Sequence, residues 1–313
     1  MKILDCTLRD GGFKNDFNWN LNFASRYYKL LSNFNISYIE LGYWKQTSKS
    51  KNPFYNMGMD ELEHITNGSN LENVSILIDY HYCDKNFKIY PKKNESQVSM
   101  IRVTSRFEDI NKAITFSKKL KDYTGIDLSF QIINSTNYSK KKIDDVVSKL
   151  IPAGFSYIYF ADSHGNLNLI EDKWKFEDAI KEMKINEIKT GFHFHNHTNR
   201  SLMNYHLCKD LGISMIDTSI LGQGKGGGNL KLENIINNEF FLELLEFIQK
   251  EKIHFKLKNT DFLYYMITGR LNVTDRYATH ALKIGLNLEK FYIRCQRLRN
   301  KDKDVFNSKL ISN

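Results

Sequence analysis

The sequence has few cysteines and no long apolar run, and both absences exclude classes of protein. Its 313 residues include four cysteines, none in a Cys-x-x-Cys pair. A disulfide-rich secreted fold and a zinc knuckle are therefore excluded, and reduced thiols are expected. No apolar run approaches the ~20 residues that cross a bilayer, and the N-terminus shows no signal-peptide core. We expect a cytoplasmic protein with no membrane partner.

The positive charge is not gathered in one patch. Lys and Arg number 45 against 36 Asp and Glu, a formal net charge of +9. Short basic runs such as residues 140–142 lie among acidic residues, which is typical of a solvated helix face. We therefore expect no nucleic-acid partner. No internal repeat or low-complexity linker divides the chain.

Short β-rich apolar runs alternate with amphipathic helical patterns along the chain. We count eight such runs, at residues 2–6, 38–42, 75–80, 100–104, 127–133, 157–161, 190–195 and 214–219. A further helix is predicted over 232–250 and an extended run over 253–257. Eight strand-helix units within ~250 residues predict an α/β fold, a (β/α)8 TIM barrel, rather than an open sheet. We predict a catalytic barrel over residues 1–258 and a helical C-terminal extension over 259–313, which covers the barrel mouth or joins subunits.

Polar residues stand at the ends of several predicted strands, where the active sites of such barrels lie. Asp10 follows the first strand, and Glu40 is an acid inside the apolar second run. His193 and His195 end the seventh strand and project to the same face, because side chains alternate along a strand. An isolated His-x-His pair is more often structural. Here the pair stands at the same end of the predicted barrel as Asp10. This favours a divalent metal site of two imidazoles and a carboxylate, with positions open for substrate.

A glycine-rich loop follows the eighth predicted strand. Residues 222–228 include five glycines and formally satisfy G-x-G-x-x-G between a strand and a helix. A dinucleotide site would also need an acidic residue for the ribose at the end of the next strand, and the extended run after that helix has none. We therefore favour a loop whose backbone approaches a ligand and whose Asn229 offers its amide oxygen to the metal.

Together these motifs resemble the DRE-TIM metallolyase superfamily, and the opening motif is most similar to its 4-hydroxy-2-oxovalerate aldolase branch. The resemblance rests on Thr7-Leu8-Arg9-Asp10-Gly11, Glu40, His193-x-His195 and Gly228-Asn229. It implies that Asp10, His193 and His195 bind Mn2+ or Mg2+, with Zn2+ or Co2+ as further candidates and Asn229 as a fourth ligand. It also implies that Arg9 neutralises an enolate oxygen and that Glu40 holds Arg9 or the metal-bound groups.

The general base is left open by the sequence. The characterised aldolases carry a histidine two residues after the Asp-Gly of this motif, where this chain has Phe13. His164, His197 and Tyr43 are candidates by position. Arg102 in the fourth strand either binds a substrate carboxylate or pairs with Glu40.

The resemblance implies a metal-dependent aldolase-type lyase that cleaves a 4-hydroxy-2-oxo acid to a pyruvate-type enolate and an aldehyde. The alternative within the superfamily is a synthase that condenses an acyl-CoA with a 2-oxo acid; such synthases usually carry Glu-Gln after the first Asp-Gly, where Gly12-Phe13 stands here. Hydroxymethylglutaryl-CoA lyase is disfavoured because its loop cysteine is missing between residues 219 and 229. A metallohydrolase barrel and a non-catalytic binding barrel are the remaining alternatives. A 2-oxo acid substrate, a homodimer and an aldehyde dehydrogenase partner are implied.

Overall fold

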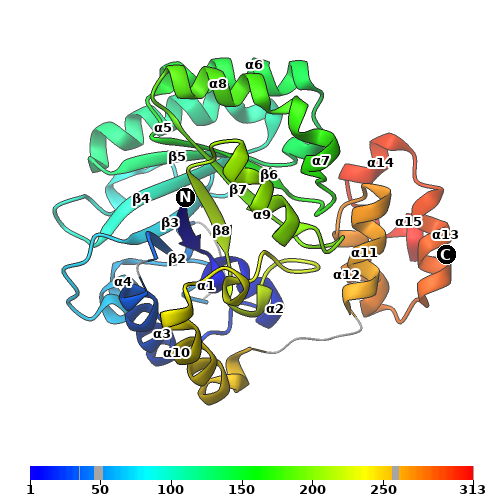
Figure 1. The fold of residues 1–313 in the computed structure, drawn as a ribbon. Coiled ribbons are helices and arrows are strands. Elements are labelled where there is room, and N and C mark those ends of the chain that lie inside the picture. The colour runs from blue at the N-terminus through cyan, green and yellow to red at the C-terminus, as the bar shows by residue number, and fades with distance from the viewer. Residues whose placement is uncertain (35, 46–51, 256–260, 313) are drawn as a thin grey trace.

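Eight parallel strands close into a barrel in a computed structural model that describes residues 1–34, 36–45, 52–255 and 261–312 (Figure 1). Neighbours in sequence are neighbours in the sheet, and β1 pairs with β8 to close the ring. The strands are β1 (Lys2–Asp5), β2 (Tyr38–Tyr43), β3 (Val74–Asp79), β4 (Val98–Ser105), β5 (Asp127–Ile132), β6 (Tyr157–Asp162), β7 (Lys189–Phe194) and β8 (Met215–Thr218). The predicted TIM barrel is confirmed, and the predicted strand ends differ from these bounds by at most two residues.

Helices surround the barrel and pack their apolar stripes on the outer face of the sheet, where the main hydrophobic core lies. Their starts follow local capping: the Asn20 side chain accepts from Phe23 N at the start of α3, and Ser139 caps α6. The barrel helices are α1 (Thr7–Asp10), α2 (Gly12–Asn15), α3 (Leu21–Asn33), α4 (Met59–Thr66), α5 (Ile110–Thr124), α6 (Lys140–Leu150), α7 (Leu169–Asp172), α8 (Glu177–Ile185), α9 (Ser201–Asp210) and α10 (Asn238–Lys250).

The barrel interior changes from apolar to charged toward the carboxyl ends of the strands. A small apolar cluster that includes Met100 and Met215 fills one layer. Two residues further along the same strands stand Arg102 and Asp217, both fully buried. Because side chains alternate along a strand, these residues face the same interior one layer higher. The sheet thus places buried charge directly beneath the end of the barrel where the site is expected.

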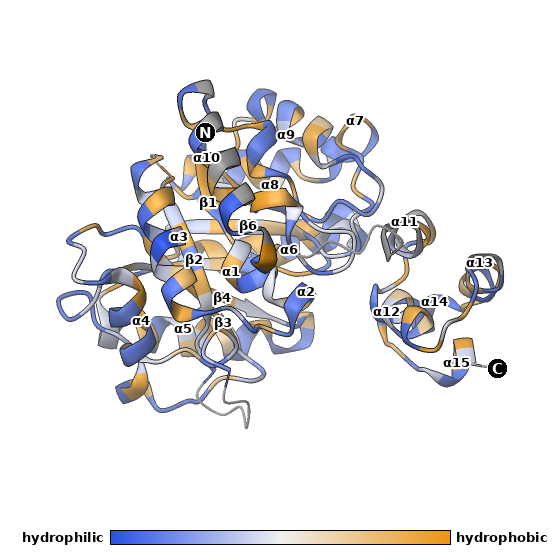
Figure 2. Ribbon diagram, turned by 90° about the horizontal axis from the view of Figure 1, so that it is seen from below, coloured by the Kyte–Doolittle hydropathy of each residue, from blue (hydrophilic) through white to orange (hydrophobic). Residues whose placement is uncertain are grey.

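The C-terminal helices form a second unit with a core of their own, which we call the cap (residues 261–312). It contains α11 (Asp261–Leu271), α12 (Arg276–Lys283), α13 (Leu288–Gln296), α14 (Asn300–Asp304) and α15 (Lys309–Ser312). Tyr277, Phe291 and Ile311 belong to its core. Figure 2 shows the cap helices grouped apart from the barrel and carrying hydrophobic residues. The boundary predicted at residues 258 and 259 lies outside the described residues.

Two predicted elements differ from the structure. The helix predicted over 232–250 begins only at Asn238, because the residues before it are tied back to the loop after β8. Leu232 N donates to Ser219 O, and the Glu233 carboxylate accepts from Leu221 N at 2.9 Å. The extended run predicted over 253–257 is wrong at its start, since Ile253 lies in a 3-10 turn, Lys252–His254. Residues 256 and 257 lie outside the described residues. No helix in the described ranges has the length and apolar character needed to cross a membrane.

Candidate active site

The turn after β1 is held by Asp5 and presents the next residues at the barrel mouth. Its carboxylate accepts from Thr7 N at 3.0 Å, Thr7 Oγ1 at 2.9 Å and Tyr27 Oη at 2.6 Å. Burial raises the pKa of Asp5 to about 7, although these hydrogen bonds oppose the shift. The short helix α1 that follows carries Arg9 and Asp10, both almost fully buried.

Arg9 is held by two carboxylates and leaves one donor free. Its Nε donates to Glu40 Oε1 at 2.5 Å, and its Nη1 donates to Asp10 Oδ1 at 2.5 Å. Burial disfavours the charged guanidinium, but Glu40 and Asp10 outweigh it and raise the pKa of Arg9 above its usual value. Nη2 is buried and has no hydrogen-bond partner among the described residues. A buried donor without a partner is costly, so it marks a place for an acceptor from a ligand.

Arg102 lies one layer deeper and pairs with two carboxylates. Its Nη1 is 3.2 Å from Glu40 Oε2, and its Nη2 is 2.7 Å from Asp217 Oδ2 and 2.9 Å from Gln131 Oε1. The side chain is fully buried, so of the two roles considered for Arg102 the structure supports the ion pair with Glu40. Asp217 is not among the residues predicted from the sequence, although it is an acid inside an apolar strand, the same signal that identified Glu40.

Asp10, His193 and His195 are brought together as predicted. Each offers one ligand atom, and these atoms all lie within 4.8 Å of one another. Burial disfavours ionisation of Asp10, but Arg9 and then the two histidines lower the pKa of Asp10. Burial also lowers the pKa of His195 well below its usual value, so its imidazole is neutral. The His195 Nδ1 atom is buried and has no hydrogen-bond partner among the described residues. A carboxylate and two neutral imidazoles fit a divalent metal ion.

The neighbouring carboxylate selects which nitrogen of His193 faces this group. Nδ1 of His193 lies 2.8 Å from Asp217 Oδ2, an acceptor, so the proton stands on Nδ1 and the lone pair on Nε2. A second cluster of Cys6, His193 and Asp217 also has metal-ligand spacing. It suits a metal less, because Arg102 occupies the Asp217 carboxylate and burial raises the pKa of the Cys6 thiol.

The glycine-rich loop closes over Asp10 and delivers Asn229. The Asn229 Nδ2 atom donates to Asp10 Oδ2 at 2.8 Å, and Lys225 N lies 3.3 Å from the same oxygen. Asn229 Oδ1 is buried and has no hydrogen-bond partner among the described residues, which fits a fourth ligand. Gly224 packs against this amide, since a Cβ there would lie 2.4 Å from Nδ2. Only glycine lets the loop approach Asn229 so closely.

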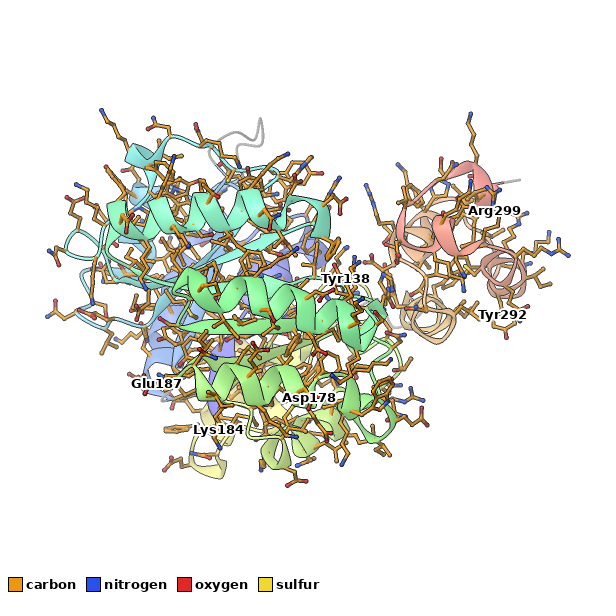
Figure 3. All side chains as sticks on the ribbon, turned by 90° about the horizontal axis from the view of Figure 1, so that it is seen from above. Tyr138, Asp178, Lys184, Glu187, Tyr292 and Arg299 are labelled. Carbon is orange, nitrogen blue, oxygen red and sulfur yellow. The ribbon has the colours of Figure 1, made fainter. Side chains whose placement is uncertain are left out.

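A cavity of about 330 Å3 opens above these residues and is closed partly by the cap. The barrel contributes Arg9, Asp10, His193 and His195 to its lining, and the cap contributes Thr274, Asp275, Arg276 and Asp304. Asp275 also lies 3.0 Å from Lys225 of the glycine-rich loop. Figure 3 shows Tyr138 on the barrel side that faces the cap, with Tyr292 and Arg299 on the cap. Of the two roles considered for the C-terminal extension, contact with the barrel mouth is the one observed.

The three candidate bases occupy different environments. His164 lines the cavity, and so does Tyr43, but burial raises the pKa of the Tyr43 phenol. His197 does not line it. Both ring nitrogens of His197 are buried without a hydrogen-bond partner among the described residues, and burial lowers its pKa to about 4. Glycines at 165, 226 and 227 pack against this imidazole, and Gly269 packs against the Cβ atom of His197.

This fold is that of a TIM-barrel class that includes metal-dependent lyases and transferases. The chain belongs to the HMGL-like family, whose model matches residues 1–260. Members of this family generally use a divalent metal ion.

Two curated proteins and a solved structure are similar to this chain. An oxaloacetate decarboxylase of Mycobacterium tuberculosis is 19% identical over 250 residues, covering 75% of this chain and 68% of the relative. A 4-hydroxy-2-oxovalerate aldolase of Thermus thermophilus is 26% identical over 148 residues, covering 43% of this chain and 41% of the relative. The N-terminal domain of an aldolase-like protein from Bacteroides vulgatus superposes with a TM-score of 0.69 at 22% identity, covering 92% of this chain and 98% of that one. At this identity the superposition shows the fold alone.

Proposed function

We propose that the protein is a divalent-metal-dependent aldolase that cleaves a 4-hydroxy-2-oxo acid into an aldehyde and a pyruvate-type enolate. One observation carries the proposal: Arg9 Nη2 is a buried donor without a hydrogen-bond partner among the described residues, on the wall of the cavity that also contains Asp10, His193 and His195. Cleavage beside a carbonyl puts negative charge on the carbonyl oxygen. A fixed guanidinium stabilises that charge most once it has developed.

The other side chains of the site would hold the metal and orient Arg9. Asp10, His193 and His195, with Asn229 as a fourth ligand, would hold Mn2+ or Mg2+. When bound, such an ion supplies Lewis-acid polarisation of the 2-oxo group. Glu40 and Asp10 fix the guanidinium of Arg9, so little reorganisation is needed as the charge forms. The cap limits the access of water to the cavity.

The proposal is tested by metal analysis and by pyruvate release. The purified chain, loaded with Mn2+, should release pyruvate and acetaldehyde in equal amounts from 4-hydroxy-2-oxopentanoate. Condensation of an acyl-CoA with a 2-oxo acid, without this cleavage, would instead support the synthase. No turnover of either kind with metal bound would refute both. The homodimer, the aldehyde dehydrogenase partner and the cytoplasmic location expected from the sequence stay predictions.

Two variants separate metal binding from charge stabilisation. His193→Ala should lose bound metal, whereas exposed His206→Ala should retain it. Arg9→Ala should retain metal, and its kcat should fall about 100-fold or more, which is the loss typically seen when one donor that stabilises a developing oxyanion is removed. Arg26→Ala, which removes a surface arginine paired with Glu251, is the matched control. Full metal content in His193→Ala, or unchanged turnover in metal-loaded Arg9→Ala, would contradict the respective assignment.

A further inference from the structure

We propose that His164 is the general base that takes the proton of the substrate hydroxyl, and that the cap completes this base by holding it with Asn272 and Asp304. The inference rests on the proposed aldolase function. It assigns to the cap a part in the chemistry, beyond closing the cavity.

His164 is presented to the cavity by a braced loop. It follows β6 and lines the cavity that Arg9, Asp10 and His193 also line. The Asp162 carboxylate accepts from the backbone N–H groups of Asn166 at 3.2 Å and Leu167 at 3.1 Å, which closes the loop around His164. The residue is only 3% exposed.

Asn272 of the cap offers His164 a hydrogen-bond acceptor. The Asn272 Oδ1 atom accepts from Asn166 Nδ2 at 3.1 Å, which orients the oxygen, and the same oxygen lies 2.9 Å from His164 Nδ1. In the proposed base, Nδ1 donates its proton to this oxygen, and Nε2 carries the lone pair that a base needs. The Asn137 Nδ2 atom also lies 2.7 Å from Nδ1 and donates to Asp304 Oδ1 at 3.3 Å, so the proposed tautomer requires this amide to give up its contact with Nδ1.

Asp304 of the cap provides a negative charge beside the lone pair. Its carboxylate lies 3.6 Å from His164 Nε2, which is beyond hydrogen-bond distance and leaves Nε2 available to a substrate hydroxyl. Once Nε2 takes a proton, the imidazolium and Asp304 form an ion pair. The other candidates lack this arrangement, because His197 does not line the cavity and the phenolate of Tyr43 is disfavoured by burial.

The proposed step balances without an oxidant or a reductant. Nε2 of His164 takes the hydroxyl proton, and the O–H electron pair forms the carbonyl of the aldehyde. The bond between C3 and C4 breaks, and its electrons form the enolate of the 2-oxo acid. The proton then returns from His164, directly or through water, to C3, which gives pyruvate and a neutral imidazole.

The experiment compares two reactions of the metal-loaded full chain that pass through the same enolate. Cleavage of 4-hydroxy-2-oxopentanoate needs the hydroxyl proton removed, whereas decarboxylation of oxaloacetate has no hydroxyl to deprotonate, and the enolate that it forms can take its C3 proton from water. His164→Asn should lower kcat for the first about 100-fold or more, the range for loss of a general base, and keep the second within about threefold after correction for free metal. Equal loss in both reactions, or no loss in the first, would overturn the proposal.

Two further measurements test the base and its partners. Free imidazole should restore part of the cleavage by His164→Ala, and absence of any rescue would count against a proton-transfer role, even if oxaloacetate is not a substrate. Asp304→Asn should lower the ratio of cleavage to decarboxylation severalfold. The control Asp302→Asn, on the same helix but paired with Arg299, should leave this ratio unchanged. An unchanged ratio in Asp304→Asn would show that Asp304 has no part in the mechanism. If the unmodified chain cleaves the hydroxy acid but these variants do not show the expected losses, only the assignment of His164 fails. If the unmodified chain turns over neither substrate with metal bound, the proposed function fails as well.

Discussion

Replacing Asp217 by Asn should weaken metal binding although Asp217 is not one of the proposed ligands. In the native chain, Asp217 Oδ2 accepts from His193 Nδ1 at 2.8 Å and from Arg102 Nη2 at 2.7 Å. Burial disfavours its charge, but Arg102 and then His193 outweigh burial and lower the pKa of Asp217, so the carboxylate is ionised at neutral pH. An amide at this position can turn its NH2 group toward Nδ1, which favours the tautomer with its proton on Nε2, the nitrogen that faces Asp10.

The size of the effect follows from what the carboxylate contributes. Loss of a carboxylate behind a metal-binding histidine typically weakens metal affinity about 10- to 100-fold, or about 1.4 to 2.7 kcal/mol. That agrees with about 1.5 to 3 kcal/mol for a hydrogen bond to a charged group. Calorimetric titration of Mn2+ into the metal-free chain measures the change directly. Asp127→Asn is the control, because it makes the same exchange at an exposed residue at the start of β5, at the end of the barrel opposite to the site.

The variant also leaves the Arg102 guanidinium with Glu40 as its remaining carboxylate partner, and breaking a buried pair commonly costs about 3 to 5 kcal/mol of stability. The double variant Arg102→Gln/Asp217→Asn removes both charges and keeps the test valid if the single variant unfolds. Native Mn2+ affinity in a folded Asp217→Asn or in the double variant would refute the argument that Asp217 orients His193.

Two further predictions concern the loop and the cap. Asp275→Asn should destabilise the protein at neutral pH. Burial disfavours the charge of Asp275, but Lys225 and then His197 outweigh burial and lower the pKa of Asp275, so the ionised carboxylate stabilises the fold. This stabilisation is present above the ordinary aspartate pKa near 3.8 and is lost as pH falls through the lower pKa of the folded state. Urea unfolding at pH 7 and pH 3 checks it, and an equal difference at both values would contradict it. Gly224→Ala should weaken Mn2+ affinity about tenfold, because its Cβ would lie 2.4 to 2.6 Å from the Asn229 amide atoms and force that side chain to move; unchanged affinity in the calorimetric titration would exclude Asn229 as a ligand.

The sequence predicted the barrel and the proposed metal ligands because both depend on local patterns. Apolar β runs between amphipathic helices located each strand, and polar residues at strand ends located Asp10, His193 and His195. Other features depend on distant pairing that no local pattern records. His164 and Asn272 are 108 residues apart and meet only through the packing of the cap on the barrel. The two roles considered for Arg102 could be separated only by its burial and by the distances to Glu40 and Asp217.

The buried charges near the mouth have a consequence for which ligands the site can accept. Two guanidinium groups, Arg9 and Arg102, stand against three carboxylates, Asp10, Glu40 and Asp217, so this group carries one net negative charge. A divalent cation would reverse the sign to one net positive charge, and a single carboxylate would then make the whole assembly neutral. Because uncompensated buried charge is expensive, cation and anion should bind in that order, with each improving the affinity of the other. The barrel would therefore favour ligands with one carboxylate over uncharged ketones, whatever their shape.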